Sequence, residues 1–329
     1  WDEAAADAAI VGLARTAGAH EIFELLLRYG VRDFRELGHK AIYIANSFRT
    51  LEVIGWHHAE PVLRSLAYAI LDRVGDPVNP AAADLPADRP FRRNAPRVGE
   101  IPEGWLDGKA DPQATRELLA ALRQGSAEDA SQAALALLRG GVGPGSLFDA
   151  CFACAGEQVM QAPGISSLHA NTFTNAVHYA FQRSRDPETR KLLLLQNAAF
   201  LPLYRGRAPD KGIRLDELEP LSAKESGAAA LDEIFAELTG DRLPAARKVL
   251  GWLRDNPDPA PFAAAARRLI FLKGRDSHDY KFSSAVLEDY LHLQPPWRDR
   301  FLAASVFNLR GAGESDSDLP SRIRAALAG

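Results

Sequence analysis

Apolar residues recur at intervals of three and four positions through most of the chain, which is the pattern of helices that bury one face. The first such stripe, formed by Ala6, Ile10, Leu13 and Ala14, ends at Gly18. Several later stripes start at an acidic residue followed by proline, a pair that favours the first turn of a helix. No segment alternates apolar and polar residues as a strand with one buried face would. The pattern predicts an all-α protein that forms a single large helical domain.

Residues 76–112 interrupt this pattern. The segment carries seven prolines, and no helical period survives in it. An irregular segment of this length is usually a functional cover or a linker. Because it also holds the apolar residues Phe91, Ile101 and Trp105, we expect a strap that packs on the domain rather than a free tether.

Two parts of the chain share an order of features that indicates an internal repeat. Glu60-Pro61 follows a helix with His39 near its start, and Asp186-Pro187 follows a helix with His169 near its start. Two copies do not make a solenoid, but they fit a duplicated domain in which the two histidines face each other. The alternative is that acidic residue–proline pairs are common helix starts that occur here twice by chance. The predicted organisation is a first helical repeat at residues 1–75, the strap at 76–112, a second helical repeat at 113–202, and C-terminal helices at 203–329 that complete the same domain.

Composition excludes some classes of protein. Hydrophobic residues make up 47% and charged residues 25% of the 329 residues, as in globular proteins with a sizeable core. The net charge of -4 gives no basis for nucleic acid as a partner. No apolar run reaches the roughly 18 residues of a membrane span, and no secretory signal is visible. We therefore expect a cytoplasmic protein, although the start at Trp1 leaves a removed signal segment open.

The only cysteines, Cys151 and Cys154, form a CxxC motif inside a predicted apolar helix. A redox motif of this kind normally follows a strand, and a four-thiolate zinc site needs a second CxxC. Neither is present in the sequence, so we expect two buried cysteines that serve packing.

The histidines are the main candidates for chemistry. Imidazole binds Zn, Fe, Cu and Ni, and helical bundles hold such ions in their interior. We predict that His39, His169 and His278 converge as metal ligands and catalytic groups, with Fe or Zn as the metal. Haem held by two facing histidines is the weaker alternative. The competing interpretation is that these are structural histidines, hydrogen-bonded near helix starts.

Other residues of the same segments are assigned secondary roles. The additional catalytic candidates are His57, His58, Asp279 and Lys281, and the cofactor-binding candidates are Tyr43, Arg49 and Trp56. Asp279 and Lys281 belong to a polar cluster around His278, which is equally well explained as a solvated loop that caps a helix.

Residues 38–43, 54–66, 168–170 and 192–203 resemble a bacterial all-helical family whose members are sometimes attached to Rieske-type iron–sulfur domains. More distantly they are similar to questin oxidase-like proteins, which are all-helical oxygenases with sparse histidine motifs. The resemblance covers most of residues 20–310 and implies oxidative chemistry with a redox partner such as a Rieske-type domain. The chain itself has none of the Cys/His pairs that a Rieske cluster requires.

The leading hypothesis is a histidine-dependent, metal-assisted oxidoreductase that acts on a small organic substrate. Its cavity would lie between the two helical repeats, under the strap. The alternative is a non-enzymatic helical scaffold, or a partner subunit of a larger complex, in which the histidines are structural.

Overall fold

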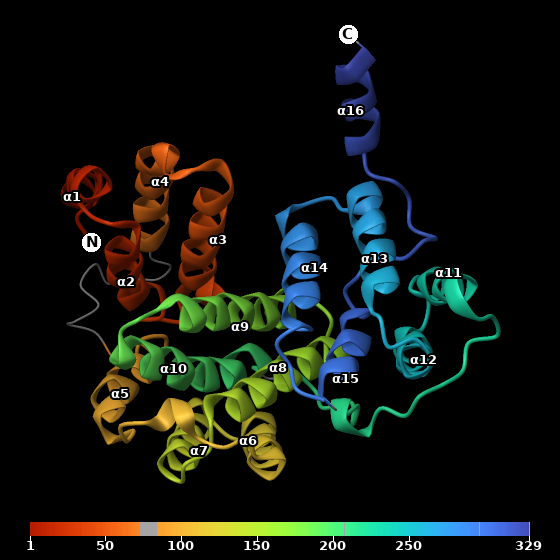
Figure 1. Cartoon of the computed structure of the whole chain (residues 1–329), viewed down its shortest axis with the longest axis horizontal. Coiled ribbons are helices and arrows are strands. Elements are labelled where there is room, and N and C mark those ends of the chain that lie inside the picture. The colour runs from red at the N-terminus through yellow and green to blue at the C-terminus, as the bar shows by residue number, and fades with distance from the viewer. Residues whose placement is uncertain (73–83, 207, 296, 329) are drawn as a thin grey trace. The chain divides into compact units, whose positions relative to one another are not determined.

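A computed structural model describes residues 1–72, 84–206, 208–295 and 297–328, and its regular elements there are helices (Figure 1). The only β-type pairing in these ranges is an isolated bridge between Lys109 and Val142. The prediction of an all-α protein is confirmed. The helices form two compact units, and helices α8 (Pro144–Gln161) and α9 (Ile165–Arg183) each contribute residues to both.

The first unit comprises residues 1–151 and 173–206. Helix α1 packs along α4, α3 packs against α2 and α4, and α10 packs against α5, α6 and α7. Besides parts of α8 and α9, its elements are α1 (Glu3–Thr16), α2 (Ala19–Gly30), η1 (Arg35–Gly38), α3 (His39–Ile54), η2 (Trp56–His58), α4 (Ala59–Leu71), α5 (Arg89–Arg97), η3 (Val98–Glu100), η4 (Trp105–Asp107), α6 (Pro112–Gln124), α7 (Ala127–Arg139) and α10 (Pro187–Arg205).

The second unit comprises residues 152–172 and 207–329. Helix α12 packs against α11 and α15, and α14 packs against α13 and α15. Besides parts of α8 and α9, its elements are η5 (Leu215–Glu217), α11 (Gly227–Glu237), α12 (Arg242–Asp255), α13 (Ala260–Lys273), α14 (Ser277–Asp289), α15 (Trp297–Ser305) and α16 (Leu319–Ala328).

The predicted strap is partly helical, which corrects the expectation of an irregular segment. Helix α5 forms within it, with Pro90 in the first turn, where a missing N–H is tolerated. Ile101 and Trp105 of this segment are buried, whereas Phe91 is half-buried. Residues 76–83 of the strap lie outside the described ranges.

Helix α3 begins at His39, and α10 continues through Pro202 to Arg205. Asp186 caps α10, accepting a hydrogen bond from the Glu188 amide at 3.2 Å, whereas Glu60 lies inside the first turn of α4. The two acidic residues that suggested a duplication therefore occupy different helix positions, and the duplication stays a prediction.

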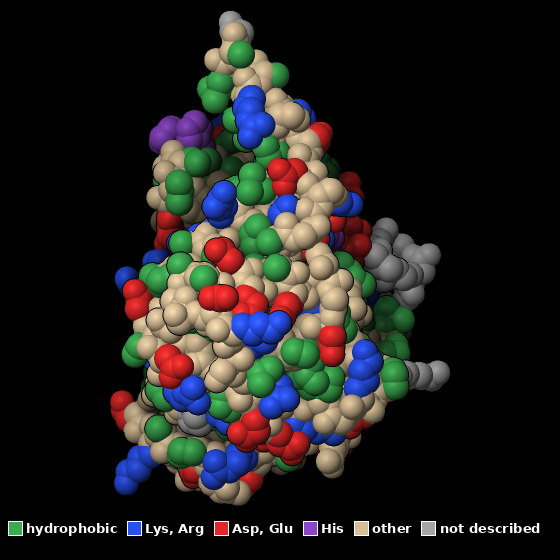
Figure 2. Space-filling model, turned by 90° about the vertical axis from the view of Figure 1, so that its right-hand side faces the viewer, with side chains coloured by type: hydrophobic (Ala, Val, Ile, Leu, Met, Phe, Trp, Pro, Cys, Tyr) green, Lys and Arg blue, Asp and Glu red, His purple; other side chains and the backbone are tan. Residues whose placement is uncertain are grey.

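On the face drawn in Figure 2, acidic and basic side chains are interspersed rather than separated by sign. Mixed charge of this kind is typical of a solvated protein surface. Within the described residues, no helix combines the length and hydropathy that crossing a bilayer requires.

Candidate metal centre

His39 is positioned by an unusual turn at the start of α3. Glu36 and Leu37 have positive φ angles of 51° and 53°, a backbone conformation that residues other than glycine rarely adopt. Gly38 follows with a φ angle of 74°. The Tyr204 hydroxyl of α10 donates a hydrogen bond to the Leu37 carbonyl at 2.8 Å. This contact stabilises the strained turn, and α3 therefore starts at His39.

Gly38 also brings this turn close to helix α9. A Cβ atom at residue 38 would lie 2.6 Å from the Phe173 ring and 2.5 Å from the Tyr204 hydroxyl, so only glycine fits. Phe173 lies on α9 one helical turn after His169. The turn before His39 therefore packs against α9 at Phe173.

His169 is buried, with 2% of its surface exposed. Its Nδ1 lies 2.7 Å from the Ile165 carbonyl oxygen, one turn earlier on α9. Because a carbonyl oxygen only accepts, Nδ1 carries the proton and donates it. In the neutral ring, Nε2 then keeps its lone pair for a metal ion or a proton donor.

His278 is oriented by the residue that caps its helix. Asp276 accepts hydrogen bonds from the His278 and Asp279 amides at 2.8 and 3.3 Å, which fixes the start of α14. The same carboxylate oxygen lies 3.5 Å from the Nδ1 atom of His278. A carboxylate beside Nδ1 favours the proton on that nitrogen and leaves Nε2 as the basic atom. The His278 and His169 rings meet edge to face, with centroids 5.3 Å apart.

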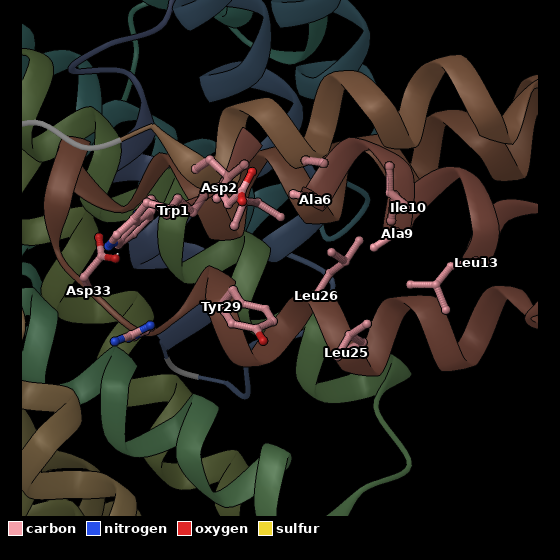
Figure 3. A pocket seen from close by; sticks show the side chains of 15 residues that line it. Trp1, Asp2, Ala6, Ala9, Ile10, Leu13, Leu25, Leu26, Tyr29 and Asp33 are labelled. Atoms are coloured by element: carbon pink, nitrogen blue, oxygen red, sulfur yellow. Dashed lines mark hydrogen bonds and ion pairs between the residues drawn. The ribbon is translucent and has the colours of Figure 1, made fainter. Parts of the chain in front are cut away.

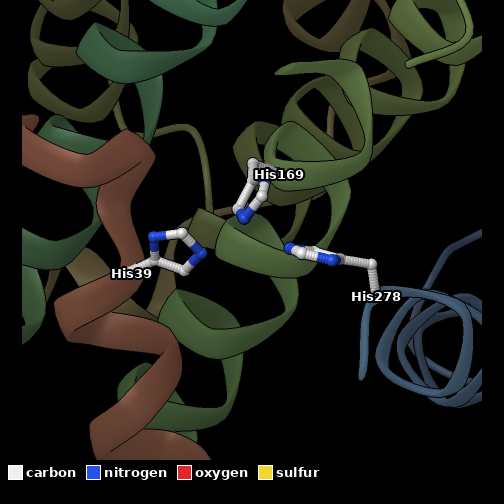
Figure 4. A group of neighbouring side chains, drawn as sticks. All are labelled: His39, His169 and His278. Atoms are coloured by element: carbon white, nitrogen blue, oxygen red, sulfur yellow. The ribbon is translucent and has the colours of Figure 1, made fainter. Parts of the chain in front are cut away.

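The three predicted ligands come together. One nitrogen of each imidazole of His39, His169 and His278 lies within 4.8 Å of the other two. Figure 4 shows each ring directing a nitrogen toward the space that the three side chains enclose. Nitrogen ligands of a tetrahedral zinc ion, with bonds of about 2.0–2.1 Å, are roughly 3.3 Å apart. The observed spacing of up to 4.8 Å is wider, so binding one ion requires the three nitrogens to move closer together.

Tyr43 is the cofactor-binding candidate that contacts this group. Its ring stacks on the His39 imidazole, one turn earlier on α3, with 5.3 Å between centroids and 9° between planes. Burial raises the pKa of the Tyr43 hydroxyl, and the negative charges of Glu36 and Asp72 raise it further. The hydroxyl is therefore protonated at neutral pH and remains a hydrogen-bond donor.

Arg49 and Trp56 have other contacts. Arg49 donates a hydrogen bond to the Asn175 side-chain oxygen at 3.3 Å, and its guanidinium lies 4.1 Å from the centre of the Tyr179 ring. Trp56 packs edge to face on Phe48. Both contacts support the packing of the first unit.

The remaining catalytic candidates lie outside the group of three ligands. His57 and His58 are exposed, with their rings 4.0 Å apart. Asp279 is buried, where its carboxylate pairs with Arg310 and accepts a hydrogen bond from the Arg275 amide at 2.8 Å. Lys281 is half-buried on α14.

Sequence reasoning missed the residues that orient the ligands. The Tyr204 hydroxyl contacts the turn before His39, the Ile165 carbonyl accepts the Nδ1 proton of His169, and Asp276 lies 3.5 Å from Nδ1 of His278. Of these, only Asp276 carried a sequence signal, because it precedes a helix at the spacing of an N-cap.

Cys151 and Cys154 are both buried on α8, as expected for cysteines that serve packing. The Gln158 side-chain amide donates to the Cys154 sulfur at 3.5 Å, and neither cysteine belongs to the group of potential metal ligands.

Comparisons with protein-family models, with curated proteins and with solved structures find no match to this chain.

Proposed function

We propose that His39, His169 and His278 bind one divalent transition-metal ion, and that the chain is a metal-dependent oxidoreductase acting on a small organic substrate. The observation that carries the proposal is that three imidazoles from helices far apart in the sequence bring their nitrogens within 4.8 Å of one another. Two of the rings also direct Nδ1 at an oxygen acceptor, as metal-bound histidines commonly do.

The donor set suits a catalytic rather than a structural ion. Three histidines leave at least one coordination position of the ion open, as in catalytic zinc sites, whereas structural sites are closed by four protein ligands. Neutral imidazoles also leave the charge of a divalent ion uncompensated, so it would polarise a bound oxygen atom strongly. An open position beside such an ion would admit a substrate oxygen or an oxidant.

The identity of the metal separates oxidative from hydrolytic chemistry. Iron changes its oxidation state, whereas zinc has no redox chemistry and would act by activating water. The resemblance to all-helical oxygenases favours iron, with dioxygen as the oxidant. A protein electron donor, such as a Rieske-type domain, would be needed if the substrate does not supply all the electrons.

The experiment is a metal titration of the purified full chain, first stripped with a chelator. Co(II) serves as a spectroscopic probe, and Fe(II) is added without oxygen. Nitric oxide then reports an open coordination position through the electron paramagnetic resonance signal of the iron–nitrosyl complex. The variants are His39→Gln, His169→Gln and His278→Gln, with His57→Gln as the control because His57 is exposed and outside the group.

We expect one ion per chain in the wild type and in His57→Gln, and an affinity at least about 100-fold lower in each of the other three variants. Metal binding that all three variants retain would disprove the centre. A centre that holds zinc after purification, and whose Fe(II) form gives no nitrosyl signal, would support metal binding but reject the oxidoreductase.

A further inference from the structure

A groove of about 480 Å³ lies in the first unit, and none of the three histidines of the candidate metal centre lines it. Its apolar walls include Ala6, Ala9 and Leu13 of α1 and Leu25 and Tyr29 of α2. Figure 3 shows these side chains along the groove, with Trp1 and Asp33 at one end. The volume falls within the range of about 300–1,000 Å³ that is typical of small-molecule sites. We refer to it as the α1–α2 groove.

The groove exists because α1 packs closely along α4 but makes few contacts with α2. Two of the α1 residues that line it are alanines, which leave the space that larger side chains would fill. Leu25 and Tyr29 are 38% and 47% exposed on the opposite wall. A ligand that covered these apolar side chains would remove them from water, which favours binding.

One end of the groove is charged, and most of its charges are already neutralised within the fold. Asp33 and Lys40 form a buried ion pair of 2.8 Å, and Lys40 also lies 4.8 Å from the centre of the Trp1 ring. Asp2 accepts a hydrogen bond from an amide of the first turn of α1, as the cap of that helix. The two carboxylates that line the groove therefore have partners.

Arg32 is the charged group that remains. It lines the groove, and no carboxylate in the described parts of the chain forms an ion pair with it. A guanidinium presents two parallel N–H donors, a geometry that matches both oxygens of a carboxylate. An apolar groove that ends at such a cation suits a molecule with an apolar body and a single carboxylate group.

We propose that the α1–α2 groove binds an apolar monocarboxylate, such as a fatty acid of medium chain length, with its carboxylate on Arg32. The site is separate from the metal centre, because none of the three histidines lines it. The tail would lie between Ala9 and Leu25, and the head group would face the end marked by Asp33 (Figure 3).

The test is calorimetric titration of the full chain with three ligands that share one tail: decanoate, decanol and decyltrimethylammonium, each below its micelle concentration. Ala9→Phe fills the groove, whereas Ala8→Phe adds the same ring on the exposed side of α1 that does not line it. Arg32→Gln removes the charge at the end of the groove. Arg28→Gln, on the exposed surface of α2, is its control. Circular dichroism establishes that each variant is folded.

We expect decanoate to bind with one molecule per chain and decanol to bind at least tenfold more weakly. Arg32→Gln should reduce the affinity for decanoate to that for decanol, and Ala9→Phe should abolish binding, while both controls bind as the wild type does. His39→Gln should also bind decanoate normally, so failure of the metal centre and failure of this site are distinguishable.

Three results would overturn the proposal. They are absence of decanoate binding, equal affinity for all three head groups, and equal binding by Ala9→Phe and Ala8→Phe. If the chain instead binds vesicles of phosphatidylglycerol through Arg32 and Ala9 and does not bind decanoate, the groove recognises a lipid surface and the proposed ligand class is wrong.

Discussion

The imidazole of His169 donates its Nδ1 proton to the carbonyl of Ile165, 2.7 Å away and one turn earlier on the same helix. The bond needs no residue from elsewhere in the chain. It orients a buried ring and leaves Nε2 as the basic nitrogen. Formation of α9 alone therefore prepares His169 as a ligand, whereas His39 and His278 depend on the turns and caps that precede their helices.

Asp276→Asn tests the orientation of His278. Asparagine caps a helix about as well as aspartate, so α14 should still begin at Ser277. The substitution removes the carboxylate 3.5 Å from Nδ1 and makes the ring a weaker metal ligand. We expect the affinity for Zn(II), measured by competition with a chelating dye, to fall by about 10- to 100-fold. Asp186→Asn changes the cap of α10 in the same way and is the control. Equal affinities of the two variants would show that Asp276 acts only as a cap.

Gly38→Ala tests the turn that places His39. The new methyl group would overlap Tyr204 and Phe173, and φ of 74° is unfavourable for alanine. Backbone strain alone should lower the free energy of unfolding by about 1–3 kcal/mol, measured by urea denaturation. Metal affinity should fall as well, because His39 is the next residue. Gly99→Ala is the control, since a Cβ atom there meets nothing within 4 Å. A loss of stability without a loss of metal affinity would show that this turn does not position His39 for metal binding.

The sequence predicts most helices because their signals are local. Asp186 followed by Pro187 marks the start of α10, and the cap is present in the structure. No acidic residue–proline pair marks the start of α3 at His39. The turn before this helix depends on the Tyr204 hydroxyl, which comes from a helix distant in sequence. No local pattern contains that contact.

The candidate site, like the helices, was predictable from the sequence only in part. The pattern around His39 and His169 singled out two ligands, and a dense polar cluster pointed to the third, His278. The cluster also offered Asp279 as a catalytic candidate, but consecutive helical residues point about 100° apart, and only the fold decides which one faces His39 and His169. His57 and His58 lie close to His39 in the sequence, yet both are exposed. Histidines that lie close together in the sequence therefore need not meet in one site.

The buried pair of Lys40 and Asp33, with side chains 2% and 3% exposed, gives a prediction about stability. Lys40→Met leaves the Asp33 carboxylate buried without its cation, which should reduce the free energy of unfolding by about 3–5 kcal/mol. The double variant Asp33→Asn/Lys40→Met removes both charges and should recover most of that loss. Urea denaturation of the wild type, both single variants and the double variant completes the cycle. Arg64→Met removes the more solvent-exposed ion pair with Asp7 and should change the free energy of unfolding much less than Lys40→Met does. Additive losses would mean that the two charges are not coupled.

Tyr179 gives a prediction for alkaline pH. Burial and the charge of Glu52 together raise the pKa of its hydroxyl to about 12, against the opposing effect of the nearby cations of Arg183 and Arg49. The ordinary pKa of tyrosine is about 10, so above that pH the unfolded chain releases this proton while the folded chain keeps it. The contribution of Tyr179 to stability is therefore complete below about pH 10 and is lost as the pH rises toward 12.

Urea denaturation from about pH 9 upward would measure this loss. We expect the stability of the wild type to fall more steeply with pH than that of Tyr179→Phe, because the variant has no hydroxyl to ionise at this position. Glu52→Gln removes the negative charge beside the hydroxyl, lowers the folded pKa and should make the fall smaller. Parallel curves for the wild type and Tyr179→Phe would mean that folding does not raise the pKa of this tyrosine.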